Sequence, residues 1–234
     1  MKLLATLRRE LRAVADAERA QQQQRYMKSD LPYHGVTSPL LRQILRRVLP
    51  AWPLDDAAGW RRDVLALWRA AEFREERYAA IALSGDRRAR AWQRFDVLPM
   101  YREIIVSGAW WDYVDDVASH RVGPLLVADP ERMKPELLRW SVADDIWLRR
   151  TSIICQLHVK QSDLDLLYGC IEPSLASREF FLRKAIGWSL RQLAWSDPDE
   201  VVRYVKRNRA RLSGLSKREA LKNLLKDGTV EAIP

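Results

Sequence analysis

Cysteine, histidine and glycine are all scarce in this chain of 234 residues, and each scarcity excludes a class of protein. Cys155 and Cys170 are the only cysteines, too few for a zinc site made of thiolates and typical of a reducing compartment. His34, His120 and His158 are scattered singly, so we expect each to be a satisfied or exposed side chain, and we expect no metal. With only nine glycines, the chain is not collagen-like.

Long hydrophobic runs are missing as well. Charged residues follow Met1 too soon for the apolar region of a signal peptide, and no later run approaches membrane-spanning length. Apolar residues still make up 47% of the chain, which is enough for a large core and too many for a disordered protein. We therefore expect a soluble, cytoplasmic protein that does not bind membranes.

Positive charge is concentrated at the two ends of the chain. Ten basic and four acidic side chains give residues 1–50 a charge of +6, and nine basic against three acidic give residues 201–234 the same charge. Residues 101–150, with seven basic and nine acidic side chains, and residues 151–200, with five and seven, each carry −2. Two basic ends favour a polyanion such as nucleic acid as the partner, although a general effect on solubility stays an alternative.

The hydrophobic pattern predicts helices almost throughout. Apolar residues recur at three- and four-residue steps, as in residues 40–49 and 163–171, and prolines divide the chain into short segments. Several segments begin with Asp, Ser or Thr, the residues that cap helix N-termini. Helix pairs recurring every 35 to 45 residues favour an all-α, HEAT-like repeat solenoid over a generic bundle. We expect one domain over residues 1–234, with flexibility only at Gln21 to Gln24 and in residues 228–234.

One segment joins an aromatic ring to an acid. Trp111 and Asp115 are four residues apart in Trp110-Trp111-Asp112-Tyr113-Val114-Asp115, so helical spacing places an indole beside a carboxylate. A cation suits such a site, because both groups attract positive charge. Two further segments, around Trp147 and Trp188, each place an arginine three residues after a tryptophan.

Three arginines differ in their helical neighbours. Arg149 follows Asp145 by one turn, which predicts an ordinary exposed ion pair. Arg150 has only apolar side chains at that spacing, so it needs an anionic partner, either a carboxylate of another helix or a phosphate of a bound strand. Arg191 has the same two options.

Most of the ten tryptophans are expected to pack in the core. Trp111 and Trp188 differ, because each shares a helical face with Asp115 or Arg191. Tyr26 lies among polar and basic residues and is as consistent with an exposed contact as with burial. The tryptophans assigned to packing are Trp52, Trp60, Trp68, Trp92 and Trp140.

Five separate blocks resemble the AlkD type of bacterial DNA alkylation repair enzymes in order and spacing, from about residue 22 to residue 222. The blocks are Arg25-Tyr26-Met27-Lys28, Trp110-Trp111-Asp112 with Val114-Asp115, Ile146-Trp147-Leu148-Arg149-Arg150, Phe180-Phe181 with Lys184-Ala185-Ile186-Gly187-Trp188 and Leu190-Arg191, and Leu215-Ser216-Lys217-Arg218-Glu219-Ala220.

The resemblance implies a HEAT-like-repeat DNA glycosylase that removes cationic alkylpurines, chiefly 3-methyladenine and 7-methylguanine, from double-stranded DNA. It implies a monomer with a concave, positively charged groove, no metal or organic cofactor, and a place in the bacterial cytoplasm on the nucleoid. The roles that it assigns are a catalytic carboxylate on Asp115, aromatic partners on Trp111 and Trp188, phosphate contacts from Arg150 and Arg191, and an N-terminal tyrosine on Tyr26. Tyr33, His34 and the basic stretch from Arg203 to Arg211 depart from the family pattern and leave the lesion preference open.

Two other functions stay open from the sequence. A non-catalytic solenoid that binds damaged or branched DNA would keep the basic ends and the arginines, but it would not need Asp115. A solenoid that serves as a protein scaffold would not need the pairing of Trp111 with Asp115 at all.

Overall fold

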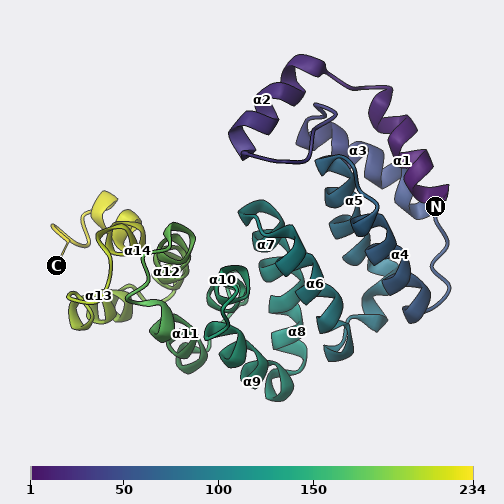
Figure 1. Ribbon diagram of the computed structural model, residues 1–234. Coiled ribbons are helices and arrows are strands. Elements are labelled where there is room, and N and C mark those ends of the chain that lie inside the picture. The colour runs from purple at the N-terminus through teal and green to yellow at the C-terminus, as the bar shows by residue number, and fades with distance from the viewer. Residues whose placement is uncertain (1, 234) are drawn as a thin grey trace. The chain divides into compact units, whose positions relative to one another are not determined.

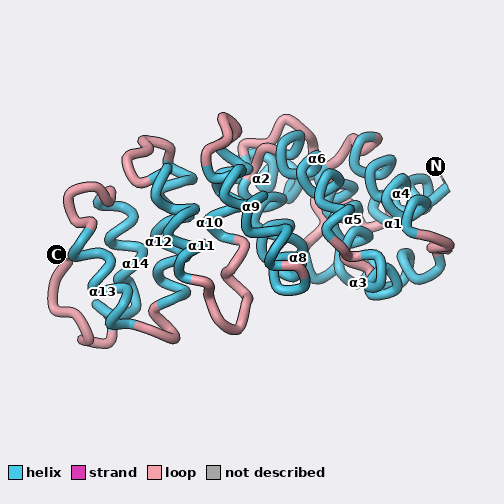
Figure 2. Tube along the Cα trace, turned by 90° about the horizontal axis from the view of Figure 1, so that it is seen from below, coloured by secondary structure: helices cyan, strands magenta, loops and turns pink. Residues whose placement is uncertain are grey.

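The computed structural model describes residues 2–233, and every regular element in this range is a helix (Figure 2). The prediction of an all-α fold is therefore confirmed. The chain forms two compact units, of which the first ends at Gln93 and the second begins at Arg94. No helix in residues 2–233 is both long and apolar enough to cross a lipid bilayer.

The first unit is built around tryptophans of one helix. Trp60 and Trp68 of α4 (Ala57–Arg69) are fully buried, and α4 packs against α5 (Arg74–Ser84). Trp52 and Trp92, also expected in the core, are partly exposed. The other helices of this unit are α1 (Lys2–Arg12), α2 (Ala17–Met27), α3 (Ser38–Val48) and the 3-10 helices η1 (Leu49–Ala51) and η2 (Arg87–Trp92).

The second unit stacks its helices in two rows. One row contains α10 (Ile146–Ile154), α12 (Phe180–Leu193) and α14 (Gly214–Lys226), each packed on the next. Figure 1 shows α9 (Pro130–Ser141), α11 (Leu164–Ile171) and α13 (Pro198–Arg207) as the second row beside it. Stacked helix pairs of this kind are the arrangement of a helical repeat solenoid. The unit begins with η3 (Phe95–Val97), α6 (Leu98–Gly108), α7 (Trp111–Val117), the π-helix η4 (Ala118–Val122) and α8 (Gly123–Ala128), and η5 (Glu172–Ser174) follows α11.

Aspartates and serines begin many of these helices, as the sequence predicts. The side chain of Asp129 accepts from the backbone N–H of Arg132 at 3.3 Å, and Asp197 accepts from Glu200 at 3.0 Å, each with proline as the first helical residue. Ser213 caps α14 in the same way. Each cap satisfies a backbone donor that the helix itself leaves without a partner.

The loop that departs from the family pattern is buried in the first unit. Tyr33 and His34 are only 7% and 5% exposed. The buried carboxylate of Glu75 accepts hydrogen bonds of 3.0 to 3.1 Å from three consecutive backbone N–H groups, those of residues 34 to 36. Gly35 has φ +83°, and a Cβ there would lie 2.0 Å from the carbonyl oxygen of Asp16, so this position requires glycine. The loop therefore fixes the start of α2.

Two segments were expected to be flexible. Gln21 to Gln24 lie inside α2, so the structure corrects that expectation for the glutamine run. The run is helical because Asp16 caps α2 and because Gln23 and Gln24 donate to the carbonyls of Val36 and Ser29. Residues 228–233 follow α14 without helix, and the flexibility of this tail stays a prediction.

The Glu75 anchor predicts a large and local effect on stability. We expect Glu75→Ala to lower the free energy of unfolding by about 3 kcal/mol, because it leaves three buried backbone donors without an acceptor. Glu72→Ala is the matched control, since Glu72 is 64% exposed and forms an ion pair with Arg8, and its loss should cost less than about 1 kcal/mol. Urea denaturation followed by circular dichroism measures both. Equal losses would show that the loop does not depend on Glu75.

Candidate active site

Asp115 lies on the short helix α7. Trp110 occupies the N-cap position and Trp111 is the first helical residue, so Trp111 and Asp115 lie one turn apart, as the spacing predicts. Both side chains are partly exposed. Helix α7 packs against α6 and α10, and α10 brings the partner of Asp115.

That partner is Arg150. Its Nε donates to Oδ1 of Asp115 and its Nη2 to Oδ2, both at 2.7 Å. Its Nη1 donates to the backbone carbonyl of Phe181 on α12 at 2.6 Å. The side chains of Arg150 and Asp115 are 5% and 14% exposed. Of the two partners that the sequence left open for Arg150, the free protein has the carboxylate, and this bidentate pair joins α7, α10 and α12.

Burial and pairing act on Asp115 in opposite directions. Removal from water raises the pKa of the Asp115 carboxyl above its ordinary value, the Arg150 guanidinium opposes this rise, and the negative charge of Asp112 adds to it. A carboxylate whose two oxygens both accept from a guanidinium is stabilised in its ionised form. Without Arg150, burial alone would favour the neutral acid.

A cluster of aromatic rings lies beside Arg150. The rings of Trp110, Trp147 and Phe181 lie 4.9 to 6.2 Å apart by their centroids. The guanidinium carbon of Arg150 lies 5.9 Å from the centroid of the Phe181 ring. The Phe181 ring restricts water near the guanidinium, and water would otherwise screen its charge.

Trp188 and Arg191 lie on α12, beside α10. Both are partly exposed, and Arg191 donates from Nη1 to Oε2 of Glu219 on α14 at 2.6 Å. Lys184 pairs with the other oxygen of Glu219 at 2.8 Å. A Cβ on Gly187 would lie 2.4 Å from the Cβ of Glu219, so glycine is what allows α12 and α14 this close. Arg191, like Arg150, thus has a carboxylate partner in the free protein.

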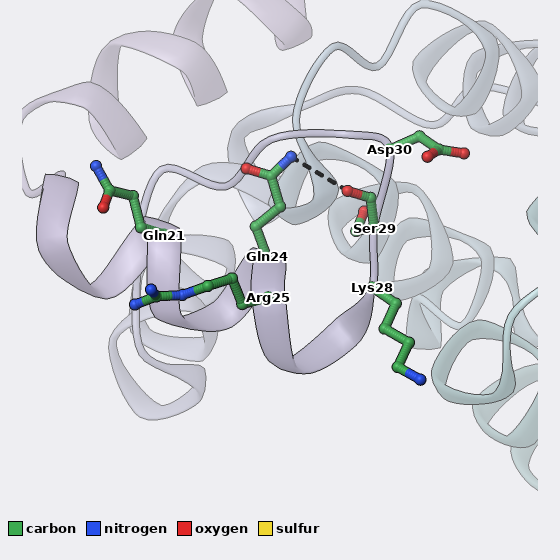
Figure 3. Close-up of a pocket in the computed structure, with 6 residues that line it drawn as sticks. All are labelled: Gln21, Gln24, Arg25, Lys28, Ser29 and Asp30. Carbon is green, nitrogen blue, oxygen red and sulfur yellow. Dashed lines mark hydrogen bonds between the residues drawn. The ribbon is translucent and has the colours of Figure 1, made fainter.

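Tyr26 belongs to the first unit and is 78% exposed on α2. Near it lies a polar cavity of about 350 Å³ (Figure 3). Gln24 crosses this cavity to donate to the carbonyl of Ser29 at 3.1 Å, while the cationic side chains of Arg25 and Lys28 extend from the end of the helix. The surface around Tyr26 is therefore basic and open to solvent. The cavity is lined by Gln21, Gln24, Arg25, Lys28, Ser29 and Asp30.

The structure corrects the predicted pairing of Arg149 with Asp145. Asp145 caps α10 by accepting from the backbone N–H groups of Trp147 and Leu148, both at 2.9 Å. Arg149 donates instead to the carbonyl of Pro173 and to the hydroxyl of Ser174, at 3.0 and 2.9 Å. As a cap, the carboxylate of Asp145 satisfies two backbone donors of α10. An exposed ion pair with Arg149 would leave both of them without this acceptor.

The basic stretch from Arg203 to Arg211 is partly neutralised by acids. Arg203 pairs with Glu200 at 2.9 Å, Arg207 lies 3.9 Å from the same residue, and Arg211 pairs with Glu172. The first two pairs lie within α13, and the third joins the segment after α13 to η5. Much of the positive charge of this segment therefore has a partner within the protein.

Sequence reasoning missed two members of the site. Glu219, the partner of Arg191, lay inside a block that was noted only for its resemblance, and the carbonyl of Phe181 carries no sequence signal. Both depend on which helices pack together, which helical periodicity does not reveal. Within residues 2–233, no three His, Cys, Asp or Glu side chains are grouped so as to hold a metal ion.

Comparison with known proteins identifies the family. The sequence profile of the DNA alkylation repair enzymes matches residues 7–224. The chain belongs to this family. A solved structure described as a predicted DNA alkylation repair enzyme from Enterococcus faecalis is 28% identical, with a TM-score of 0.79, and the match covers 91% of this chain and 97% of that one. No curated protein matches the sequence. The family resemblance stated from the five sequence blocks is thus confirmed.

The buried pair of this family member predicts a pH-dependent stability defect. We expect Arg150→Ala to lower the free energy of unfolding by about 3 kcal/mol at pH 7, because it leaves the Asp115 carboxylate buried and unpaired. A raised folded-state pKa means that the folded protein holds the proton more tightly. Stability is therefore regained as the pH falls below that pKa and lost as the pH rises through it. The defect should accordingly shrink at pH 4.5, measured by urea denaturation.

Arg149→Ala serves as the control for this prediction. It removes hydrogen bonds to Pro173 and Ser174 but leaves no buried charge, so its defect should be about 1 kcal/mol and independent of pH. A defect of Arg150→Ala that stays the same from pH 4.5 to pH 7 would contradict the role assigned to Asp115.

Proposed function

We propose that this member of the family is a DNA glycosylase that hydrolyses the N-glycosidic bond of cationic alkylpurines, such as 3-methyladenine and 7-methylguanine, in double-stranded DNA. The observation that carries the proposal is the carboxylate of Asp115, held in a fixed position by Arg150 one helical turn from the partly exposed Trp111. The family supplies DNA alkylation repair as the setting.

The chemistry of the leaving group explains why one carboxylate suffices. A purine alkylated at N3 or N7 already carries positive charge, so it departs as a neutral base and needs no general acid. Positive charge develops on the deoxyribose instead as the bond to C1′ breaks. A fixed negative charge in a site of low dielectric stabilises that charge more strongly than it stabilises the ground state, which is the condition for catalysis.

Asp115 retains the capacity for this role while it is paired. An ionised carboxylate offers about four lone-pair sites, and Arg150 occupies one on each oxygen. The remaining sites can face the sugar and hold the water that attacks C1′. In this mechanism Arg150 orients the carboxylate, and the faces of Trp111 and Trp188 add an attraction for positive charge of roughly 0.5 to 2 kcal/mol each.

Phosphate contacts would hold the duplex at this site. The hydrogen bonds of Arg150 use three of its five N–H donors, which leaves two for a phosphate oxygen. Arg191 has donors beyond the one that it gives to Glu219. Tyr26, exposed on the first unit, is a separate candidate for contact with DNA. HEAT-like helix pairs that present a concave, basic groove to the backbone would grip the DNA without a deep pocket for an extruded base.

Hydrolysis in this mechanism needs no cofactor and no amine nucleophile. Water attacks C1′ directly, so no covalent bond joins the enzyme to the sugar, and the strand stays intact. The product is an abasic site in continuous DNA. We propose that the enzyme acts as a monomer.

A non-catalytic protein that binds damaged or branched DNA is the second candidate. The ion pair of Asp115 with Arg150 supports this candidate, because a purely structural role in holding α7 to α10 would also explain the pair. In that case the charge of Asp115 would contribute to folding, and no base would be released. The excision assay below separates the two functions.

The proposed mechanism predicts a specific loss on removal of one charge. We expect Asp115→Asn to lower the rate of 7-methylguanine excision by roughly ten- to a thousandfold, because the lost interaction acts on charge that appears only in the transition state. Duplex binding should stay within a few fold. Release of methylated bases from alkylated duplex DNA under single-turnover conditions measures the rate.

The matched control is Asp116→Asn, which removes the same charge from the next residue of α7. Asp116 is 47% exposed and lies 3.6 Å from Arg121, so its loss should leave excision unchanged. Excision by Asp115→Asn at the wild-type rate would favour the non-catalytic function.

The leaving-group argument predicts substrate selectivity as well. Uracil and hypoxanthine are neutral, and nothing at the site supplies a proton to them, so we expect their excision to be at least a hundredfold slower than that of 7-methylguanine. Electrophoresis of end-labelled duplexes, with and without alkali, measures both base release and strand cleavage. Efficient release of uracil, or strand cleavage without alkali, would contradict the mechanism.

A further inference from the structure

A second cavity lies in the second unit, toward the C-terminal end of the helical segment that carries Asp115. It has a volume of about 610 Å³ and is lined by η4, α8 and the loop that follows α10. Its polar lining consists of Ser119, His120, His158, Lys160 and Gln161. The mechanism proposed above uses none of these residues.

Two imidazole rings stack at this cavity. The ring centroids of His120 and His158 are 4.8 Å apart, and the ring planes are within 7° of parallel. Burial lowers the pKa of His120, and the nearby ring of His158 and the charge of Arg121 lower it further, while Asp116 opposes them. Two cationic rings at this distance would repel each other, and an anion beside them would offset that repulsion.

Around the histidine pair, the cavity is lined by hydrogen-bond donors and by no acidic side chain. Arg121 is engaged with Asp116 at 3.6 Å and with the carbonyl of His120 at 3.0 Å. Helix α8 contributes only apolar side chains to the lining, and the loop after α10 contributes the ammonium group of Lys160. Ser119 is 5% exposed, and its hydroxyl can donate a hydrogen bond. The lining contains no acid, so it is suited to an anion.

The geometry of the rings decides between a metal ion and an oxyanion. Imidazole lone pairs lie in the ring plane, and two nearly parallel planes do not meet at one point, so the two rings cannot both coordinate one ion in this arrangement. A tetrahedral oxyanion does not have this restriction. Its oxygens lie apart from one another, so each N–H can donate to a different oxygen, and the hydroxyl, amide and ammonium groups can reach the others.

We propose that this cavity binds a phosphate group and that binding is coupled to the uptake of a proton by the His120 and His158 pair. The anion relieves the repulsion between the two rings when they carry positive charge. The phosphate group therefore binds more tightly at acidic pH.

The cavity and Asp115 share one continuous helical segment. His120 follows Asp115 by five residues in the continuous helical segment from α7 through η4. A phosphodiester of a nucleic-acid strand and a terminal or free phosphate present the same chemistry to the cavity. The experiment distinguishes these sources, and it does not depend on the glycosylase reaction.

The test is isothermal titration calorimetry of the full chain at pH 6.0 and pH 8.0 and constant ionic strength. One ligand is the dinucleotide TpT, whose phosphodiester keeps its charge across this range, and the other is inorganic phosphate. We expect TpT to bind at least tenfold more tightly at pH 6.0, with the uptake of about one proton. Tighter binding of TpT than of inorganic phosphate assigns the cavity to a phosphodiester, and the reverse assigns it to a terminal phosphate.

Three variants separate the cavity from general electrostatics. His120→Gln and His158→Gln should each weaken binding at pH 6.0 by tenfold or more and abolish its pH dependence, and Lys206→Gln, which removes an exposed charge from α13, should do neither. Circular dichroism confirms that each variant is folded. Binding that does not depend on pH, that survives both histidine substitutions, or that is absent for both ligands at pH 6.0 would overturn the proposal. None of these results bears on excision, because Asp115 and Arg150 are unchanged.

Discussion

The bidentate pairing of Arg150 with Asp115 is the interaction on which the rest of the second unit depends. It closes a connection between α7 and α10, and the bond from Arg150 to the carbonyl of Phe181 extends that connection to α12. Each of these helices belongs to a different position along the stack, so one guanidinium holds three successive layers in register. A residue of this kind cannot be replaced by another cation without loss, because only the planar fork of arginine reaches all three acceptors at once.

The same pairing balances two opposing demands on a catalytic carboxylate. A carboxylate that is to act on developing charge must be removed from water, because bulk water screens its field. Removal from water also raises its pKa and favours the neutral acid, which has no field to offer. Arg150 opposes this rise in pKa without returning the carboxylate to water. The ring of Phe181 lies against the guanidinium.

The fold and the family followed from local signals, and the partners did not. Helical periodicity, the aspartate caps and five sequence blocks predicted an all-α member of the DNA alkylation repair enzymes, and the spacing of Trp111 and Asp115 placed both on one helix. The apolar neighbours of Arg150 showed that it needed an anion, but they could not identify Asp115, 35 residues away, because that contact depends on how α7 packs against α10. For Arg149 the prediction from its helical neighbours was wrong, because backbone N–H groups at the start of α10 bind the carboxylate of Asp145 instead. Tyr33 and His34 lie in the loop that the carboxylate of Glu75 binds, a contact that local sequence signals do not reveal.

The close approach of α12 and α14 at Gly187 makes the last helix of the stack a counterion for the site. Glu219 arrives from α14 and holds both Lys184 and Arg191 of α12. A protein that ended before α14 would lose this acid and would present two unmatched cations on the helix that carries Trp188. Helix α14 thus sets the electrostatic potential at the surface of α12. A late segment of the chain thereby tunes the chemistry of residues that precede it in the sequence.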